Sequence, residues 1–68
     1  MEEIKISTEF IKLDQFLKWV GICATGVDAK FFIIDGNVKV NGEIEIRRGK
    51  KLYPGDKVEA AGKTFIVK

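Results

Sequence analysis

Four cations stand almost together near the middle of the sequence, and they are the side chains best suited to chemistry. The run is Arg47-Arg48-Gly49-Lys50-Lys51, and it contains no acidic residue. Arginine offers forked N–H donors that match two phosphate oxygens at once, and lysine adds a point charge. Gly49 would let the backbone approach a phosphate closely. The run therefore predicts an anion-binding site.

Catalytic and metal-binding chemistry has little support in the sequence. Histidine, the commonest general base and metal ligand, is absent, and the lone cysteine, Cys23, cannot build a zinc site or a Cys–His nucleophile. The carboxylates are scattered singly, and Gly49-Lys50 lacks the other residues of a phosphate-binding loop. We therefore expect no enzyme activity, no cofactor and no metal. Cys23 is expected to be a small buried apolar residue.

Length and charge limit the remaining possibilities. A chain of 68 residues with 46% apolar residues predicts one small globular domain, residues 1–68. There is no apolar run of about 18 residues and no signal-peptide pattern, so we expect a cytoplasmic protein. Residues 1–36 hold four Lys against six Asp/Glu (−2), and residues 37–68 hold eight Lys/Arg against four (+4). This asymmetry predicts an interaction surface in the second half.

Two helices are predicted in the first half of the chain. The first has an apolar stripe at positions i, i+3, i+4 and i+7, formed by Leu13, Phe16, Leu17 and Val20. Gly21 would end this helix, and Trp19, off the stripe, would pack against the next segment. The second helix opens with a capping box at Thr25 and ends at Gly36. Because only residues 22–24 join them, the two helices should pack together.

The second helix has two apolar stripes rather than one. One consists of Ala29, Phe32 and Ile33, and the other of Val27, Phe31 and Ile34. A helix that packs on one side leaves a second stripe either covered by another element or exposed. Residues 2–6 alternate and predict a short edge strand. We expect this strand to cover the second stripe.

A hairpin is predicted around Asn41-Gly42, with two possible registers. A two-residue loop would pair Val40 with Glu43, which mixes apolar and charged residues on one face. A three-residue loop would pair Val40 with Ile44 and keep that face apolar. We favour the three-residue loop.

The end of the chain predicts a turn and two further strands. Pro54-Gly55 is the signature of a type II turn. The two strands are predicted from the alternating residues Val58, Ala60, Phe65 and Val67. A turn at Ala61-Gly62-Lys63 would join them. The predicted order is one strand, two helices and four to five short strands, which is an α+β fold.

Other groups could extend the positive surface. The start of the second helix, Thr25-Gly26, offers free N–H groups, the positive end of the helix dipole and a hydroxyl. Lys30 lies one turn further on, and Lys12 lies just before the first helix. Each lysine alone would be an ordinary solvated side chain, but their coincidence with the cationic run favours a polyanion. A continuous track requires the run and the start of the second helix to share one face.

Four short segments carry a resemblance to a known family. They are Lys12-Leu13-Asp14-Gln15-Phe16-Leu17, Thr25-Gly26 with Ala29-Lys30, Gly36 to Gly42, and Tyr53-Pro54-Gly55-Asp56. In order and spacing they resemble the ribosomal protein S4-type RNA-binding domain, also called the alpha-L motif. The run from Arg47 to Leu52 is similar to the short stand-alone bacterial branch of that family. The resemblance spans nearly the whole chain.

The resemblance implies an alpha-L fold, with two packed helices against a small, bent, mostly antiparallel sheet, and it implies binding to structured RNA. Carried over by position, the RNA-binding residues are Lys12, Gln15, Thr25, Gly26, Lys30, Lys39, Asn41, Arg47, Arg48, Lys50 and Lys51. Lys12 stands where arginine is typical, which weakens a bidentate contact there. Phe31 and Ile34 stand where many members are polar, which leaves room for a partner-protein surface.

The sequence as a whole predicts a small RNA-binding protein that recognises structured RNA, ribosomal or transfer RNA, by phosphate and shape. It would act in ribosome assembly or translation in the bacterial cytoplasm, as a monomer that contacts ribosomal particles. A platform for base stacking is not expected, because Tyr53 is the only aromatic residue near the cations. The alternative is a protein-interaction module that uses the stripe of Val27, Phe31 and Ile34.

Overall fold

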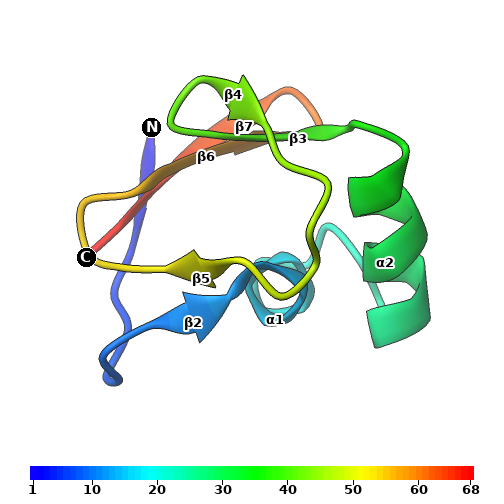
Figure 1. Ribbon diagram of the computed structural model, residues 1–68. Coiled ribbons are helices and arrows are strands. Elements are labelled where there is room, and N and C mark those ends of the chain that lie inside the picture. Colours follow the sequence, from blue (N-terminus) through cyan, green and yellow to red (C-terminus); the bar gives the residue numbers. More distant parts are fainter.

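The computed structural model describes residues 1–68 and consists of two helices and seven short strands (Figure 1). In chain order they are β1 (Glu2–Ile4), β2 (Ile11–Lys12), α1 (Leu13–Trp19), α2 (Gly26–Ile34), β3 (Val38–Val40), β4 (Glu43–Ile44), β5 (Lys51–Leu52), β6 (Lys57–Ala60) and β7 (Lys63–Val67). Neither helix has the length and apolar character needed to cross a membrane. The predicted α+β class is confirmed.

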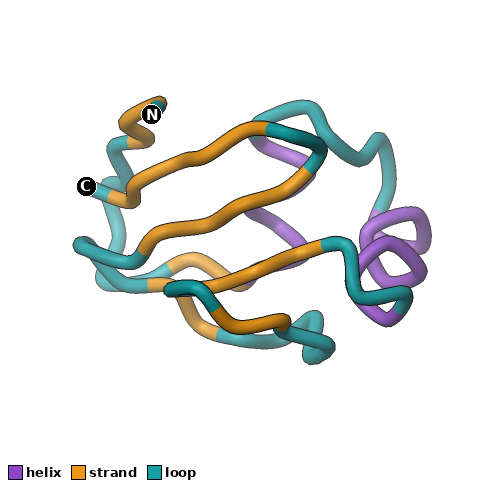
Figure 2. Tube along the Cα trace, turned by 90° about the horizontal axis from the view of Figure 1, so that it is seen from above, coloured by secondary structure: helices purple, strands orange, loops and turns teal.

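The strands form two sheets of unequal size. The main sheet has the order β1-β7-β6-β3-β4, in which β1 runs parallel to β7 and the other neighbours are antiparallel. β2 and β5 form a separate antiparallel pair, the small sheet. In Figure 1 the small sheet lies below the main sheet and beside α1, and α2 stands at the right edge. Figure 2 shows the main strands from above, running side by side, with α2 to one side of them.

One apolar core joins the helices to both sheets. It contains fourteen buried residues, none of them charged. Three residues of α1, Leu13, Phe16 and Leu17, are fully buried. The ring of Phe16 meets that of Phe65 on β7 edge-on, with ring centroids 5.6 Å apart and planes at 83°, an arrangement worth about 0.5–1.5 kcal/mol beyond burial. The predicted stripe of α1 thus fixes the helix, and with it the position of its first turn.

Both helices begin and end where the sequence predicts. Thr25 Oγ1 accepts a hydrogen bond from the N–H of Asp28 at 3.1 Å, which is the predicted cap of α2. Gly21 and Gly36 follow the two helices with φ of 83° and 82°. This left-handed conformation costs glycine little and ends a helix. The short-range signals in the sequence are therefore reliable here.

The register that the sequence favours for the β3–β4 hairpin is wrong. Val40 pairs with Glu43, so the loop contains only Asn41-Gly42. Their φ of 53° and 87° are those of a type I′ turn, whose twist matches that of the paired strands. β4 has only two residues and lies at the edge of the main sheet. The turn therefore sets the register, and Ile44 is left exposed.

The first strand does not cover the second stripe of α2, contrary to the expectation from the sequence. The strand is shorter than residues 2–6 and pairs with β7, at the edge of the main sheet opposite to β4. Val27, Phe31 and Ile34 consequently remain 62%, 58% and 50% exposed. Trp19 is also exposed, and it lies beside residues of β1. The ladder with β7 takes β1 away from α2.

Two other strand features differ from the prediction. The strand β2 is only two residues long and has no pattern of its own; it forms because β5 returns to lie beside it. The last turn consists of Ala61-Gly62 alone, with φ of 52° and 73°, so Lys63 already belongs to β7. The pairing of β2 with β5 matters most, because it places the cationic run beside α1.

Candidate nucleic-acid interface

The loop between β4 and β5 lies on the first turn of α1. The main-chain carbonyls of Lys50 and Arg48 accept hydrogen bonds from the N–H groups of Leu13 at 2.8 Å and Asp14 at 3.1 Å. These carbonyls replace the side-chain cap that α1 lacks. Gln15, in the same turn, and Arg48 are exposed, whereas Lys50 is half-buried. The backbone of the loop is therefore fixed while its charged side chains remain available.

The small sheet adds two lysines to this loop. Lys12 and Lys51 face each other across β2 and β5. With the two cations of the loop they form what we call the basic cluster: Lys12, Arg48, Lys50 and Lys51. None of the four forms an ion pair with a carboxylate. Like charges at facing positions of neighbouring strands repel, and a phosphate bound between the two lysines would offset such a repulsion.

Arg47 differs from the basic cluster because a carboxylate already engages its guanidinium. Its Nε and Nη2 donate to the two oxygens of Glu45 at 3.0 and 3.2 Å, and its main-chain N–H donates to the same carboxylate at 3.1 Å. The side-chain hydrogen bonds lower the pKa of Glu45 and raise the pKa of Arg47. A phosphate would have to compete with Glu45 for this edge of Arg47.

A hollow of about 330 Å³ lies between the β3–β4 hairpin and the loop. It is lined by Val40, Asn41, Glu43, Ile44, Glu45, Arg47 and Lys50. Two cations and two carboxylates share it, so it has no excess positive charge. The amide of Asn41 donates to Asp56 Oδ1 at 3.1 Å and accepts from the N–H of Lys57 at 2.9 Å. Asn41 therefore ties the hairpin to the turn after β5, and one amide hydrogen is left for a ligand.

The start of α2 is a separate position for an anion. The N–H groups of Gly26 and Val27 donate to no protein acceptor, and Lys30 is exposed one turn further on. No hydrogen bond or ion pair joins this end of α2 to the basic cluster. In Figure 1, α2 begins at the lower right of the view, apart from the loop that meets α1. Thr25, Gly26 and Lys30 thus lie together, and a face shared with the basic cluster remains a prediction.

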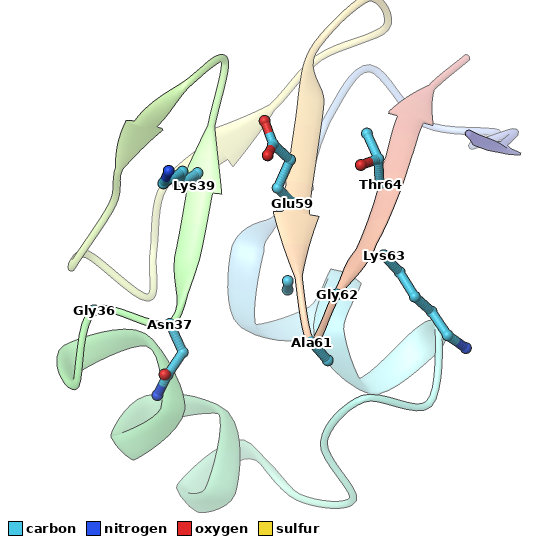
Figure 3. A pocket seen from close by; sticks show the side chains of 9 residues that line it. Gly36, Asn37, Lys39, Glu59, Ala61, Gly62, Lys63 and Thr64 are labelled. Carbon is cyan, nitrogen blue, oxygen red and sulfur yellow. The ribbon is translucent and has the colours of Figure 1, made fainter.

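Lys39 lies on the outer face of the main sheet. Its neighbours on β3, Val38 and Val40, are buried on the core side, so Lys39 points the other way. It lies beside Glu59 of β6, and both line a hollow of about 310 Å³ near the end of α2 (Figure 3). Figure 3 shows these side chains standing side by side on adjacent strands, with Lys63 directed away. The structure does not bring Lys39 to the basic cluster.

A second aromatic residue lies near the cations, which corrects the expectation that Tyr53 is alone there. The rings of Phe10 and Tyr53 have centroids 5.9 Å apart and planes tilted by 50°. The Nζ atom of Lys51 lies 4.8 Å from the centre of the Phe10 ring. Sequence reasoning missed Phe10 because its partner comes 43 positions later; only the register of the small sheet reveals the pair.

The thiol of Cys23 and the carboxylates add no reactive or metal-binding site to this surface. Cys23 is buried, and burial raises the pKa of its thiol, with a smaller effect of Asp28 in the same direction. The thiol therefore stays protonated at neutral pH. The structure contains no group of three or more Cys, Asp or Glu residues placed to hold a metal ion. The arrangement is suited to holding anions at its surface.

Known proteins share both the sequence and the fold. The sequence model of the S4 domain family matches residues 4–68. The probable ribosome maturation protein RlbA of Bacillus subtilis is 49% identical over 59 residues, which cover 87% of this chain and 83% of that protein. The putative RNA-binding protein YbcJ of Escherichia coli is 38% identical over 57 residues, which cover 84% and 81%. The solution structure of E. coli YbcJ, described as an alpha-L motif involved in RNA-binding, matches with a TM-score of 0.72 at 32% identity, over 98% of this chain and 86% of that one. The predicted alpha-L fold is confirmed.

Proposed function

Because this chain belongs to the S4 domain family, we propose that it is an RNA-binding protein that holds structured RNA by its phosphates. The observation that carries the proposal is the basic cluster, in which four cations that form no ion pair with a carboxylate surround the start of α1. The hydrogen bonds from Leu13 and Asp14 fix the loop before any ligand arrives, which lowers the entropy lost on binding. We propose a binding role without enzyme activity.

We propose that the bound RNA is ribosomal RNA, with transfer RNA as the alternative. The support is the 49% identical relative, which is named a probable ribosome maturation protein, and the E. coli relative, which is named a putative RNA-binding protein. Both matches cover more than four fifths of each chain, so they concern the whole domain. We place the protein in the cytoplasm, as a monomer that acts in ribosome assembly or translation.

Recognition is expected to depend mainly on phosphate positions. The cluster presents charge on a fixed backbone, and folded RNA is recognised largely by shape and backbone contacts. If each of the four cations neutralises one phosphate, log K should fall with log salt at a slope of about −3 to −4. A slope of that size would distinguish RNA held by the cluster from an apolar association.

Two variants with the same change in charge test the proposal. The cluster variant changes Lys12, Arg48, Lys50 and Lys51 to Gln, and the control variant changes Lys5, Lys18, Lys63 and Lys68 to Gln. Filter binding to a ribosomal RNA hairpin should show loss of affinity by at least about a hundredfold for the cluster variant at 0.1 M salt. The control variant should bind within a few-fold of the wild type. Equal losses in the two variants would show that only net charge matters and would overturn the assignment.

A second candidate function rests on the exposed stripe of Val27, Phe31 and Ile34. Exposed apolar residues on one helix face are typical of a contact with another protein. Sedimentation separates the two candidates. A protein-interaction module would be favoured if the protein self-associates, if Phe31→Glu abolishes this self-association, and if the sedimentation of the protein mixed with RNA does not change with salt concentration.

A further inference from the structure

Two lysines of the small sheet, Lys12 and Lys51, and two aromatic residues directly next to it, Phe10 and Tyr53, form a group that we call the square. Lys12 faces Lys51 in the register of β2 and β5. Ile11 and Leu52 form the pair next to them, and the same register extended one pair beyond the strands would place Phe10 opposite Tyr53, which agrees with a distance of 5.9 Å between their ring centroids. Side chains alternate between the two faces of a sheet. The aromatic pair and the lysine pair therefore share one face.

The other face of the small sheet is directed into the protein. Leu52 is fully buried and Ile11 is half-buried against the core. The face that carries the square is thus the one turned to solvent. Residues two apart along a strand are separated by about 6.7 Å, so the aromatic pair and the lysine pair lie within the reach of one nucleotide.

Tyr53 is both exposed and held in place. It is 43% exposed, while its main-chain N–H donates to Asp56 Oδ2 at 2.8 Å and its carbonyl accepts from the N–H of Asp56 at 3.0 Å. The N–H of Gly55 donates to the carbonyl of Val67 at 2.7 Å, which ties this turn to β7. An accessible ring whose main chain is fixed can stack on a base with a smaller loss of entropy than a ring on a mobile segment.

Phe10 lies next to the Tyr53 ring, and Lys51 lies next to Phe10. The Phe10 ring packs against Tyr53, and the ammonium group of Lys51 lies over Phe10 at 4.8 Å from its centre. A cation at this distance is attracted by the ring, so the positive charge is kept next to the aromatic pair. Lys12 provides a second charge opposite Lys51.

From this geometry we propose that the small sheet holds one unpaired nucleotide of the bound RNA. Its base stacks on Tyr53, and its adjoining phosphate lies between Lys12 and Lys51. The inference rests on the proposed RNA binding and narrows the class of RNA to one with a bulged or looped-out nucleotide beside a folded region. An uninterrupted duplex keeps its bases stacked internally and would contact the basic cluster only.

A purely structural role of the aromatic pair predicts a different outcome. Aromatic pairs across two strands stabilise a sheet, and a ring that only stabilises would affect binding to every RNA equally. The discriminating readout is the preference between two RNAs. Urea unfolding of each variant reports stability separately, and Tyr53 is exposed enough for substitution without loss of the fold.

The test compares two RNA hairpins with the same stem, one of which carries a single bulged nucleotide. The wild type and Tyr53→Phe, which keeps the ring, should prefer the bulged hairpin by roughly 5- to 150-fold. Tyr53→Leu, which keeps apolar bulk without the ring, should lose this preference while its affinity for the uninterrupted hairpin and its salt slope stay unchanged.

The stacking site would be overturned by the absence of a preference in the wild type, by a preference that Tyr53→Leu retains, or by an equal loss of affinity for both hairpins in Tyr53→Leu. The proposed function fails in a different way. In that case the wild type binds neither hairpin in a salt-dependent manner, or the cluster variant binds the uninterrupted hairpin as well as the wild type does.

Discussion

Replacing Glu45 by Gln should strengthen RNA binding, although it removes an ion pair. In the free protein, two hydrogen bonds at 3.0 and 3.2 Å hold the guanidinium of Arg47 against this carboxylate. The side chain of Arg47 is nevertheless 71% exposed. Glutamine can accept one of the hydrogen bonds but carries no charge, so Arg47 becomes available to a phosphate next to the basic cluster.

The size of the effect follows from the number of phosphates contacted. Each neutralised phosphate adds about 0.9 to the magnitude of the salt slope. The four cations of the basic cluster give a slope of about −3.6, and Arg47 as a fifth gives about −4.5. At 0.1 M salt, one additional contact of this kind strengthens binding by up to about eightfold.

The assay is filter binding of a ribosomal RNA hairpin at about four or five salt concentrations between roughly 0.05 and 0.5 M. Over such a range log K falls linearly with log salt. Glu43→Gln is the matched control, because Glu43 is exposed, lies two residues away and forms no ion pair. The control should leave the slope unchanged. If Glu45→Gln and Glu43→Gln strengthened binding equally, with no difference in slope, the release of Arg47 would be refuted.

Three further predictions follow from the same contacts. Lys12→Gln removes the repulsion with Lys51 and should raise the free energy of unfolding by about 0.2–1 kcal/mol while it weakens RNA binding; a loss of stability in urea would contradict this. The hydrogen bonds from Arg47 lower the pKa of Glu45 in the folded protein, so the contribution of Glu45 to stability is present above the unfolded pKa of about 4.3 and is lost as the pH falls through the folded pKa. The difference in urea midpoint between wild type and Glu45→Gln should therefore be constant from about pH 7 to pH 5 and shrink below about pH 4. A difference that grows in acid would be inconsistent with the ion pair of Glu45 and Arg47. Phe16→Ala should lower the free energy of unfolding by about 3–5 kcal/mol, which is most of the stability of a domain this small. A melting temperature that circular dichroism shows to be unchanged would disprove the role of the Phe16–Phe65 contact.

The helices could be predicted because their signals are local. The stripe of α1, the cap at Thr25 and the glycines at 21 and 36 all act within a few residues of the element they define. The type II turn is local too: Gly55 has φ of 101°, and the N–H of Asp56 bonds to the carbonyl of Tyr53. Such features need no knowledge of the rest of the fold.

The pairings of short strands could not be predicted in the same way. At Asn41-Gly42, apolar alternation and turn geometry favour different registers, and the turn prevails because β4 is a two-residue edge strand. β2 and β5 have two residues each and meet only because the loop between β4 and β5 docks on α1. Two-residue strands carry too little pattern to reveal their partner.

The candidate site was predictable only where its residues are close together in the sequence. The cationic run is visible in the sequence, but its grouping with Lys12 depends on the small sheet. The pairing of Arg47 with Glu45 had a local signal, since residues two apart in an extended segment share a side. The aromatic pair of Phe10 and Tyr53 had none, because it joins segments far apart in the chain.

Amide shifts of the labelled protein, recorded while a ribosomal RNA hairpin is added, test the central claim most directly. Phosphates held at the start of α1 should move the signals of residues 12–15 and 47–53, including the N–H groups of Leu13 and Asp14, whose acceptors belong to the loop. The signals of Phe31 and Ile34, which lie away from the start of α2, should stay in place. Shifts concentrated on those two residues, with residues 12–15 and 47–53 unmoved, would contradict the account.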